Sequence, residues 1–560
     1  MQIDRPFMID SFGPHSTMTI SHAQLTTAFR ARELGLISIV FLIVGSLLLA
    51  LYAASGYALL TNIADDAFFF YRYALNFTNG NGFSWLPSGP AEYGGTSQLF
   101  QIVITLLHAI SPSANELVLP FASMAFGFLA SGALVIIILM TAPKEVQLAG
   151  RLAVALALGG IQAKLSDHYF TGMETTFSVL MVSIFVLVLL VSSDRHRFSI
   201  CCLFVPLIYL TRPEAALIPG FTTLTMLAAM GRRRWLENQT IRWMAIAAGL
   251  LLSQWILFWF VYRTPVPTAF YVKSFNSVYS SEAVREYAFG NVNELYQLAR
   301  SCAIPLMLSL VAVAILVSVS WHNNAWQIGL TLGALMFVLY GVFGNRLPIT
   351  SGAARFFVPV LSVLALLSGL ASWRLWTSAD RLDGLLLART VLAAALVCNA
   401  VVQLPPMIGA LARGLVFPAI QCKFDCWSPA ARAEALVRNI KSQGKWDALL
   451  PYVEQIPRNC SIADTEVGAV GALDWERPWL DYSGLNYLDL VRRRNAVEQL
   501  LKDQPDFAFL GRITWYWGVT AEQLARLKEA FEPVDVPASG MPTMLYVRKQ
   551  SNCIRHVPVH

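Results

Sequence analysis

The sequence predicts a polytopic α-helical membrane protein with about eleven spans and a C-terminal soluble α/β domain. Of its 560 residues, 56% are hydrophobic and only 14% are charged, whereas an ordinary soluble domain carries roughly 25% charged residues. Apolar runs of membrane-spanning length recur up to about residue 403, and a mixed, charged composition follows. These observations divide the chain into a transmembrane module, residues 1–403, and an α/β domain, residues 404–560.

The apolar runs mark the spans in order. After Arg30 and Arg32, the run ending near residue 60 is long enough to cross a bilayer and too long for a signal-peptide core, so it is predicted as a retained first span. The run at residues 198–230 is too long for one helix, and "TRPE" interrupts it, which predicts a hairpin. The other runs lie near residues 117–141, 150–166, 172–192, 242–262, 301–320, 325–343, 356–376 and 384–404.

Basic loops set the orientation. Lys and Arg cluster near residues 30–32, 144–151, 195–197, 232–234 and 374–381, and such loops are cytoplasmic by the positive-inside rule. The N-terminus is then cytoplasmic, while the first loop, residues 60–116, and the C-terminal domain are external. Residues 98–110 cannot be a full crossing without inverting the basic loops. A segment of about 13 residues has the length of a re-entrant or interfacial helix. With this segment left out, the predicted number of spans is eleven.

The external domain shows alternating strand-like and helical segments. "CSIADTEV", "DFAFLG" and "TMLYVRK" are typical of strands, whereas "SPAARAEALVRNIKSQ", "LDLVRRRNAVEQLLKDQ" and "TAEQLARLKEAF" are typical of helices. About 150 residues are enough for an independent core. The domain is expected either to bind an acceptor glycan, with tryptophans that stack on sugars, or to brace the outer loops.

Two adjacent acids, Asp65 and Asp66, stand where the first span should emerge. The following "AFFFYRYALNF" has apolar residues at helical spacing, interrupted by Arg72 and Asn76, which predicts an amphipathic helix on the outer surface. Side chains next to each other on a helix point about 100° apart, so the two acids should not share one proton. One acid can face a cavity while the other caps or stabilises the helix. The alternative is that Asp65 only caps the helix.

Further ionisable residues fall near membrane boundaries on the same predicted face. They are His168, Glu174, Arg212, Glu214, Lys273, Arg346 and Arg355. Charges at membrane depth are costly and mark functional cavities by default, although each could instead pair structurally. Cations suit a phosphate group, and a carboxylate suits general-base work on a hydroxyl.

A series of short segments resembles bacterial membrane glycosyltransferases of the GT-C superfamily, in order and at comparable spacing. The segments, which cover about residues 65–530, are "DDAFFFYRYALNFTNGNGFSW", "EYGGTSQL", "TGMETTF", "LTRPEA", "YRTPVPTAFYVKS", "GAARFFVPVL" and "IADTEVGAVGAL" with "WLDYSGLNYLD". The greatest similarity is to the group of the mycobacterial terminal arabinofuranosyltransferase. Gln98 and Ala215 depart from the pattern beside the charged residues and leave the sugar and acceptor unspecified.

The resemblance implies an inverting transferase that moves a sugar from a polyprenyl-phosphate donor to a glycan or protein acceptor outside the bacterial cytoplasmic membrane. It assigns Asp65 first, and Asp66 second, as the base that deprotonates the acceptor hydroxyl. Lys273, Arg212 and Arg355 become ligands of the donor phosphate. The remaining candidates for sugar or acceptor binding are Glu174, Glu92, Arg72, His168 and Glu214.

Alternatives to this enzyme remain open. A transporter or lipid-linked-sugar flippase would place charges along a midplane pathway and show inverted repeats, neither of which is visible in the sequence. An inactive assembly protein on the same scaffold is a third reading. No cofactor is required, a divalent cation is conceivable at the paired acids, and nothing indicates a nucleic-acid partner.

Four of the eight cysteines fall in the external domain. A periplasmic location would be oxidising, which permits two disulfides. The favoured pairs are Cys422 with Cys426, and Cys460 with Cys553. A zinc site competes, but the spacing of Cys460 and Cys553 lacks the second close pair that structural zinc sites usually show.

Overall fold

The computed structural model describes residues 60–553, with gaps. The gaps are residues 62, 142–160, 162–163, 166, 231–234, 236, 276–278, 303–305, 307–308, 311–323, 345–354, 378–428, 443–445, 466, 512–516 and 537–542. The expected first span, the run at 384–404, and most of the runs at 150–166 and 301–320 therefore lie outside the described residues.

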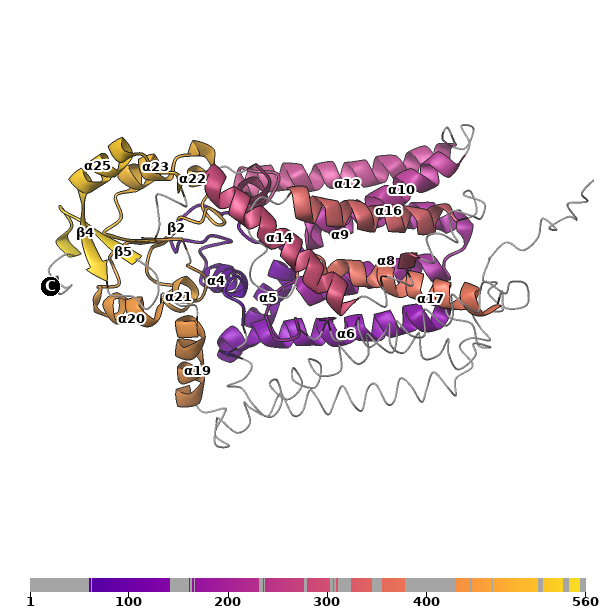
Figure 1. The fold of residues 1–560 in the computed structure, drawn as a ribbon, viewed down its shortest axis with the longest axis horizontal. Coiled ribbons are helices and arrows are strands. Elements are labelled where there is room, and N and C mark those ends of the chain that lie inside the picture. The colour runs from indigo at the N-terminus through magenta and orange to yellow at the C-terminus, as the bar shows by residue number, and fades with distance from the viewer. Residues whose placement is uncertain are drawn as a thin grey trace, which may run out of the picture.

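A bundle of apolar helices forms one end of the molecule (Figure 1). Its helices are α6 (Val118–Thr141), α8 (Thr175–Val191), α9 (Asp194–Thr211), α10 (Leu217–Ala229), α12 (Asn238–Tyr262), α16 (Ala325–Leu339) and α17 (Leu361–Thr377). The predicted break at "TRPE" is present, because α9 ends at Thr211 and the 3-10 turn η2 (Pro213–Ala216) separates it from α10. Arg212 and Glu214 thus stand at a helix junction.

Within the described part of the chain, three helices are long and apolar enough to cross a membrane. They are Asn115–Thr141, Asn238–Tyr262 and Ala325–Gly344. Shorter apolar helices cover Gln98–Ile110, Thr175–Val191 and Val358–Ala371. The count of eleven spans stays a prediction, since several of the expected runs are not described.

Two glycines explain how closely α16 approaches α10. A Cβ at Gly329 would lie 2.6 Å from the Cα of Thr222, and one at Gly333 would lie 2.7 Å from the Cα of Ile218. Small residues four apart let two helix backbones meet, which is a common packing device in membranes. The contact fixes the end of α16, where a π-helical turn, Tyr340–Gly344, follows.

The first loop contains helices α4 (Ala67–Thr78) and α5 (Gln98–Ile110). The bounds of α5 agree with the predicted short helix, and the Ser97 side chain caps it by accepting from the N–H of Phe100. The polar side of α4 is not exposed, as an amphipathic surface helix would require, because Arg72 and Asn76 are fully buried. Its position outside the membrane stays a prediction. The Arg72 guanidinium and the Asn76 amide nitrogen donate to backbone carbonyls, which lowers the cost of covering α4 on its polar side as well as its apolar side.

The C-terminal domain holds a five-stranded sheet in the order β2-β1-β3-β5-β4, at the opposite end of the molecule from the bundle (Figure 1). Strand β1 pairs in parallel with β2 and β3, whereas β5 pairs antiparallel with β3 and β4. The strands are β1 (Ile462–Asp464), β2 (Trp479–Asp481), β3 (Phe507–Gly511), β4 (Phe531–Val536) and β5 (Thr543–Arg548). The sequence predicted three of these strands and missed β2 and β4.

Helices flank this sheet in the order that the sequence predicted, with one difference. The segment expected as one helix over residues 488–504 is split, because Arg494 adopts a left-handed conformation and Asn495 caps a new helix. The helices are α19 (Pro429–Ser442), α20 (Trp446–Gln455), α21 (Gly468–Leu473), α22 (Leu488–Arg493), α23 (Ala496–Asp503) and α25 (Ala521–Ala530). The sequence did not indicate α20 or α21.

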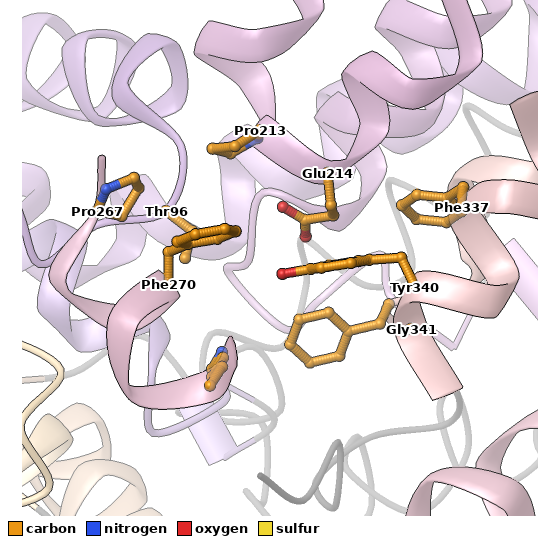
Figure 2. Close-up of a pocket in the computed structure, with 10 residues that line it drawn as sticks. Thr96, Pro213, Glu214, Pro267, Phe270, Phe337, Tyr340 and Gly341 are labelled. Atoms are coloured by element: carbon orange, nitrogen blue, oxygen red, sulfur yellow. The ribbon is translucent and has the colours of Figure 1, made fainter. Parts of the chain in front are cut away.

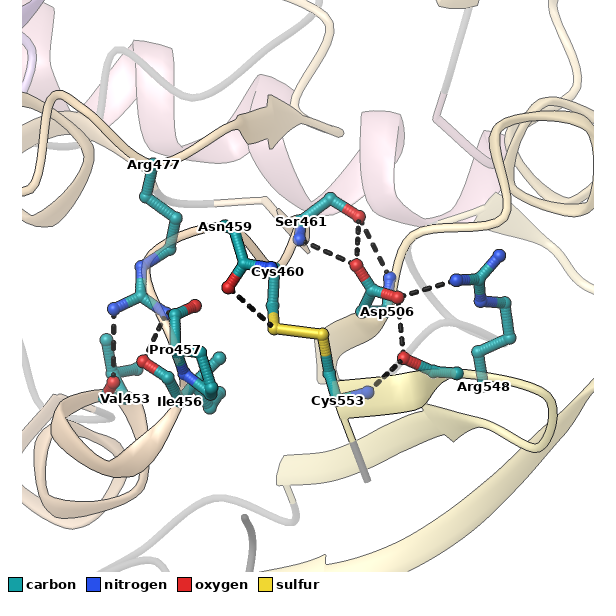
Figure 3. Close-up of a disulfide and its surroundings, with 11 residues drawn as sticks. Val453, Ile456, Pro457, Asn459, Cys460, Ser461, Arg477, Asp506, Arg548 and Cys553 are labelled. Carbon is teal, nitrogen blue, oxygen red and sulfur yellow. Dashed lines mark hydrogen bonds and ion pairs between the residues drawn. A yellow bond between two sulfur atoms is a disulfide. The ribbon is translucent and has the colours of Figure 1, made fainter. Parts of the chain in front are cut away.

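A disulfide joins Cys460, just before β1, to Cys553, after β5 (Figure 3). It is one of the two pairs expected from the sequence. Asp506 lies beside it and accepts hydrogen bonds from Ser461 and Arg548. Because the two sulfur atoms are bonded to each other, they are not available as zinc ligands. Cys422 and Cys426 lie outside the described residues.

Candidate functional site

Three cations that are distant in the sequence surround one aromatic ring. The guanidinium carbons of Arg212 and Arg355 lie 4.6 Å and 5.3 Å from the centre of the Phe356 ring, and the Lys273 ammonium lies 4.7 Å from it. Arg212 follows α9, Lys273 belongs to helix α13 (Thr268–Phe275), and Arg355 precedes the 3-10 turn η4 (Val358–Val360). The structure thus brings together all three residues predicted to bind a phosphate.

Acids balance these cations. Asp66 forms an ion pair with Arg355. Arg212 lies 2.7 Å from Glu214 and 3.8 Å from Glu174, measured between charged atoms. Three acids therefore face three cations, so the cluster can lose or rearrange an ion pair when an anion binds.

Arg212 has hydrogen-bonding capacity to spare. Its side chain is 2% exposed, and its Nε and Nη1 atoms make no hydrogen bond to any residue that the structure describes. A buried guanidinium with open donors is costly, and a bound anion with several oxygens would relieve this cost. The Oε2 atom of Glu174 likewise has no hydrogen bond within the described residues.

Burial and neighbouring charges in this cluster shift the pKa values of Asp66 and Lys273. Burial raises the pKa of Asp66, but the nearby Arg355 and Lys273 outweigh it and leave the pKa below its ordinary value. Burial, reinforced by Arg355, lowers the pKa of Lys273 to about 8. Asp66 is therefore a weak base in this arrangement, and Lys273 titrates not far above neutrality.

A small cavity opens beside the cations (Figure 2). Figure 2 shows Glu214 directed toward the space next to Phe270 and Tyr340. The rings of Phe270 and Tyr340 are nearly parallel, with centroids 6.5 Å apart and an interplanar angle of 10°. The lining residues are Thr96, Pro213, Glu214, Pro267, Phe270, Lys273, Phe337, Tyr340, Gly341 and Phe356.

Sequence reasoning missed the aromatic half of this cavity. Phe270 lies three residues before Lys273, within a segment that was noted only for its similarity. Tyr340 begins the π-helical turn after α16, and such turns are frequent at functional sites. No local pattern separated these rings from the many aromatic residues of an apolar chain.

The two adjacent acids bind different partners. Asp66 faces Arg355, whereas Asp65 Oδ1 accepts a hydrogen bond of 2.7 Å from the backbone N–H of Ala469 in the C-terminal domain. Asp66 occupies the N-cap position of α4 but makes no side-chain capping bond. The two carboxylates therefore have different partners, and a divalent cation at the pair stays a prediction.

Arg72 lies in the contact between α4 and the C-terminal domain. Its guanidinium donates to the carbonyl oxygens of Trp85, Gly471 and Arg477 and stacks on the Trp85 ring at 4.2 Å. Carbonyls occupy three of its donor atoms, and it does not line the cavity. These contacts give Arg72 a structural role, and the sugar or acceptor contact predicted for it stays a prediction.

Glu92 and His168 are also buried away from the cavity lining. Burial, followed by the nearby Asp481, raises the pKa of Glu92 well above its ordinary value. His168 is 2% exposed, and its carbonyl accepts from the Ser123 hydroxyl at 2.9 Å. Of the five residues predicted for sugar or acceptor binding, Glu174 and Glu214 join the cation cluster, and Glu214 alone of the five lines the cavity.

No protein-family model matches the chain, and no curated protein matches its sequence. Among solved structures, it is similar to the crystal structure of ArnT from Cupriavidus metallidurans in the apo state. The TM-score is 0.47 and the identity 13%, over 91% of this chain and 97% of that one. Similarity at this level carries no argument about the reaction, so the functional conclusion depends on the site itself.

Proposed function

We propose that the protein is an inverting membrane glycosyltransferase that takes a sugar from a polyprenyl-phosphate donor. The acceptor is a cell-envelope glycan or a protein on the outer face of the bacterial cytoplasmic membrane. The observation that supports the proposal most directly is the convergence of Arg212, Lys273 and Arg355 beside a small aromatic cavity. The sequence resemblance described above supports the same reaction.

The cations suit a phosphate that becomes a leaving group. As the bond between the anomeric carbon and the phosphate oxygen breaks, its electron pair stays on the phosphate and the negative charge grows. Fixed positive charges in a water-poor site stabilise such charge more in the transition state than in the ground state. The open donors of Arg212 make it the first partner for these oxygens.

Asp65, which is not among the described residues that line the cavity, is the proposed base. The acceptor hydroxyl oxygen forms the new bond to the anomeric carbon from the face opposite the phosphate, and the hydroxyl proton passes to Asp65. Asp66 is less suited to this task, because its ion pair with Arg355 and its lowered pKa reduce its basicity. Its proposed role is to hold Arg355 and Lys273 in place when no phosphate is bound.

The cavity offers contacts for the sugar. Glu214 and Glu174 can accept hydrogen bonds from hydroxyl groups, and Phe270 and Tyr340 present ring faces to the apolar side of a sugar. Among the described residues, Arg212, Lys273 and Arg355 gather around the single ring of Phe356. This distribution suits a transferase better than a transporter.

The test uses purified protein in vesicles that contain polyprenyl-phosphate sugars. Asp65→Asn should abolish transfer while donor binding and folding persist, and Asp66→Asn should be severely impaired. Mass analysis of envelope glycans from a deletion strain should show the loss of one terminal sugar. Full turnover by both variants would refute the base assignment, and transport without glycosidic bond formation would favour a flippase.

A further inference from the structure

We propose that the C-terminal domain is a built-in positioning element for the catalytic site. It holds the base-bearing segment through Gly468 and Ala469, and it holds the phosphate-binding lysine through Val272. This inference rests on the proposed function and chooses between the two roles that the sequence left open for the domain, binding an acceptor glycan and bracing the outer loops.

The first contact fixes Asp65. Helix α21 packs against α4, and its Ala469 N–H donates to the Asp65 carboxylate at 2.7 Å. The neighbouring Gly468 leaves room for this approach, since a Cβ there would overlap both the carboxylate and the carbonyl oxygen of Asp65. One oxygen of the base is thereby oriented by a domain more than 400 residues further along the chain.

The backbone around Asp65 is tied to the same domain on both sides. The Asn439 side chain donates to the carbonyls of Leu60 and Ile63, each at 2.9 Å. The indole N–H of Trp85 donates to the Trp479 carbonyl at 2.7 Å. Together with the buried Arg72, these bonds hold the segment from residue 60 to residue 85 against the domain.

The second contact fixes Lys273. Val272 is fully buried in a hydrophobic cluster that includes Tyr482 and Leu490 of the C-terminal domain. Adjacent helix positions differ by about 100°, so α13 directs Val272 into the domain while Lys273 faces the cavity. The Tyr279 hydroxyl, which donates to the Ser483 carbonyl at 3.2 Å, anchors the chain just beyond α13.

The two contacts act on opposite sides of the reaction. One holds the group that takes the acceptor proton, and the other holds a group that binds the leaving phosphate. A misplacement of about 1 Å can cost roughly 100-fold in rate, because a near-attack geometry tolerates little displacement. The domain therefore supports catalysis by fixing distances and angles, although none of its described residues lines the cavity.

Three variants test this inference. Gly468→Ala should lower kcat about 10- to 100-fold with little change in the KM of the donor. Val272→Ala should raise the donor KM and weaken binding of unmodified polyprenyl phosphate several-fold, measured by calorimetry. Val497→Ala is the matched control: it removes the same atoms from a buried valine of α23 that belongs to neither of the hydrophobic clusters at the two contacts, and it should leave the kinetics and phosphate binding unchanged.

Thermal unfolding and size-exclusion profiles establish that each variant is folded before its kinetics are compared. If Gly468→Ala does not fold, Val272→Ala decides the question by phosphate binding alone. Folded variants with wild-type kinetics and phosphate binding would overturn the inference, as would an increase confined to the acceptor KM, which would indicate acceptor binding. Wild-type protein that binds no polyprenyl phosphate would instead refute the proposed function.

Discussion

Deprotonation of Lys273 should lower the kcat/KM for the donor at alkaline pH, and one substitution should abolish this decline. The ammonium group of Lys273 is positive below its pKa, and that pKa is lowered to about 8 by burial and by Arg355. As the pH rises through 8, the free enzyme loses this charge, and its affinity for the donor phosphate falls. The kcat/KM for the donor reports titrations of the free enzyme, so it should decline on this limb.

The size of the decline follows from the titration. One pH unit above the pKa, about one tenth of the lysines remain protonated, so kcat/KM at pH 9 should be about tenfold below its plateau near neutrality. An ordinary lysine, with a pKa near 10.4, would show almost no loss at that pH. Lys273→Arg keeps a positive charge throughout this range because a guanidinium does not lose its proton.

The assay measures initial rates in vesicles from pH 6 to pH 10 at subsaturating donor. Wild-type enzyme should show an apparent pKa of about 8, and Lys273→Arg should lack this limb even if its plateau is lower. Lys502→Arg, at an exposed position of α23, is the control and should retain the wild-type profile. The same alkaline limb in Lys273→Arg would refute the assignment of this titration to Lys273.

Three other outcomes are expected. Arg72→Ala should lower the free energy of unfolding by about 3 kcal/mol, because it leaves buried carbonyls without their charged donor; a change within about 0.5 kcal/mol in denaturant unfolding would contradict this. Cys460→Ser should destabilise the C-terminal domain by about 2–4 kcal/mol, since the disulfide closes a long loop, and thermal unfolding without reductant should detect it. Reporter fusions should score inside at Arg195 and outside at Gly172 and Pro112; an inside result at Pro112 would mean that residues 98–110 cross the membrane.

Local patterns were sufficient for many elements of the fold. The bounds of α5, the break between α9 and α10, and strands β1, β3 and β5 all follow from runs of apolar residues and their interruptions. Arg212, Lys273 and Arg355 were also identifiable, because a charged side chain beside an apolar run stands out in composition. Such features depend on residues within a few positions of one another, so they can be predicted from a single sequence.

Strands β2 and β4 could not be predicted from local composition. Strand β4 contains Pro533 and two acids, and β2 has only three residues. Both lie at the edges of the sheet, where a proline is tolerated because one side of the strand needs no partner. Their strand conformation comes from the neighbours β5 and β1, which no local pattern reveals.

The amino-acid sequence by itself determined the apolar spans, the charged residues at their ends and the cysteines available for pairing. The tertiary structure alone decided which partners Asp65 and Asp66 contact, that α4 is buried, and that Arg72 joins two domains. These outcomes depend on contacts between segments up to about 400 residues apart. A buried charge is stable only where such distant partners satisfy its hydrogen bonds, and those partners are assembled only by the complete fold.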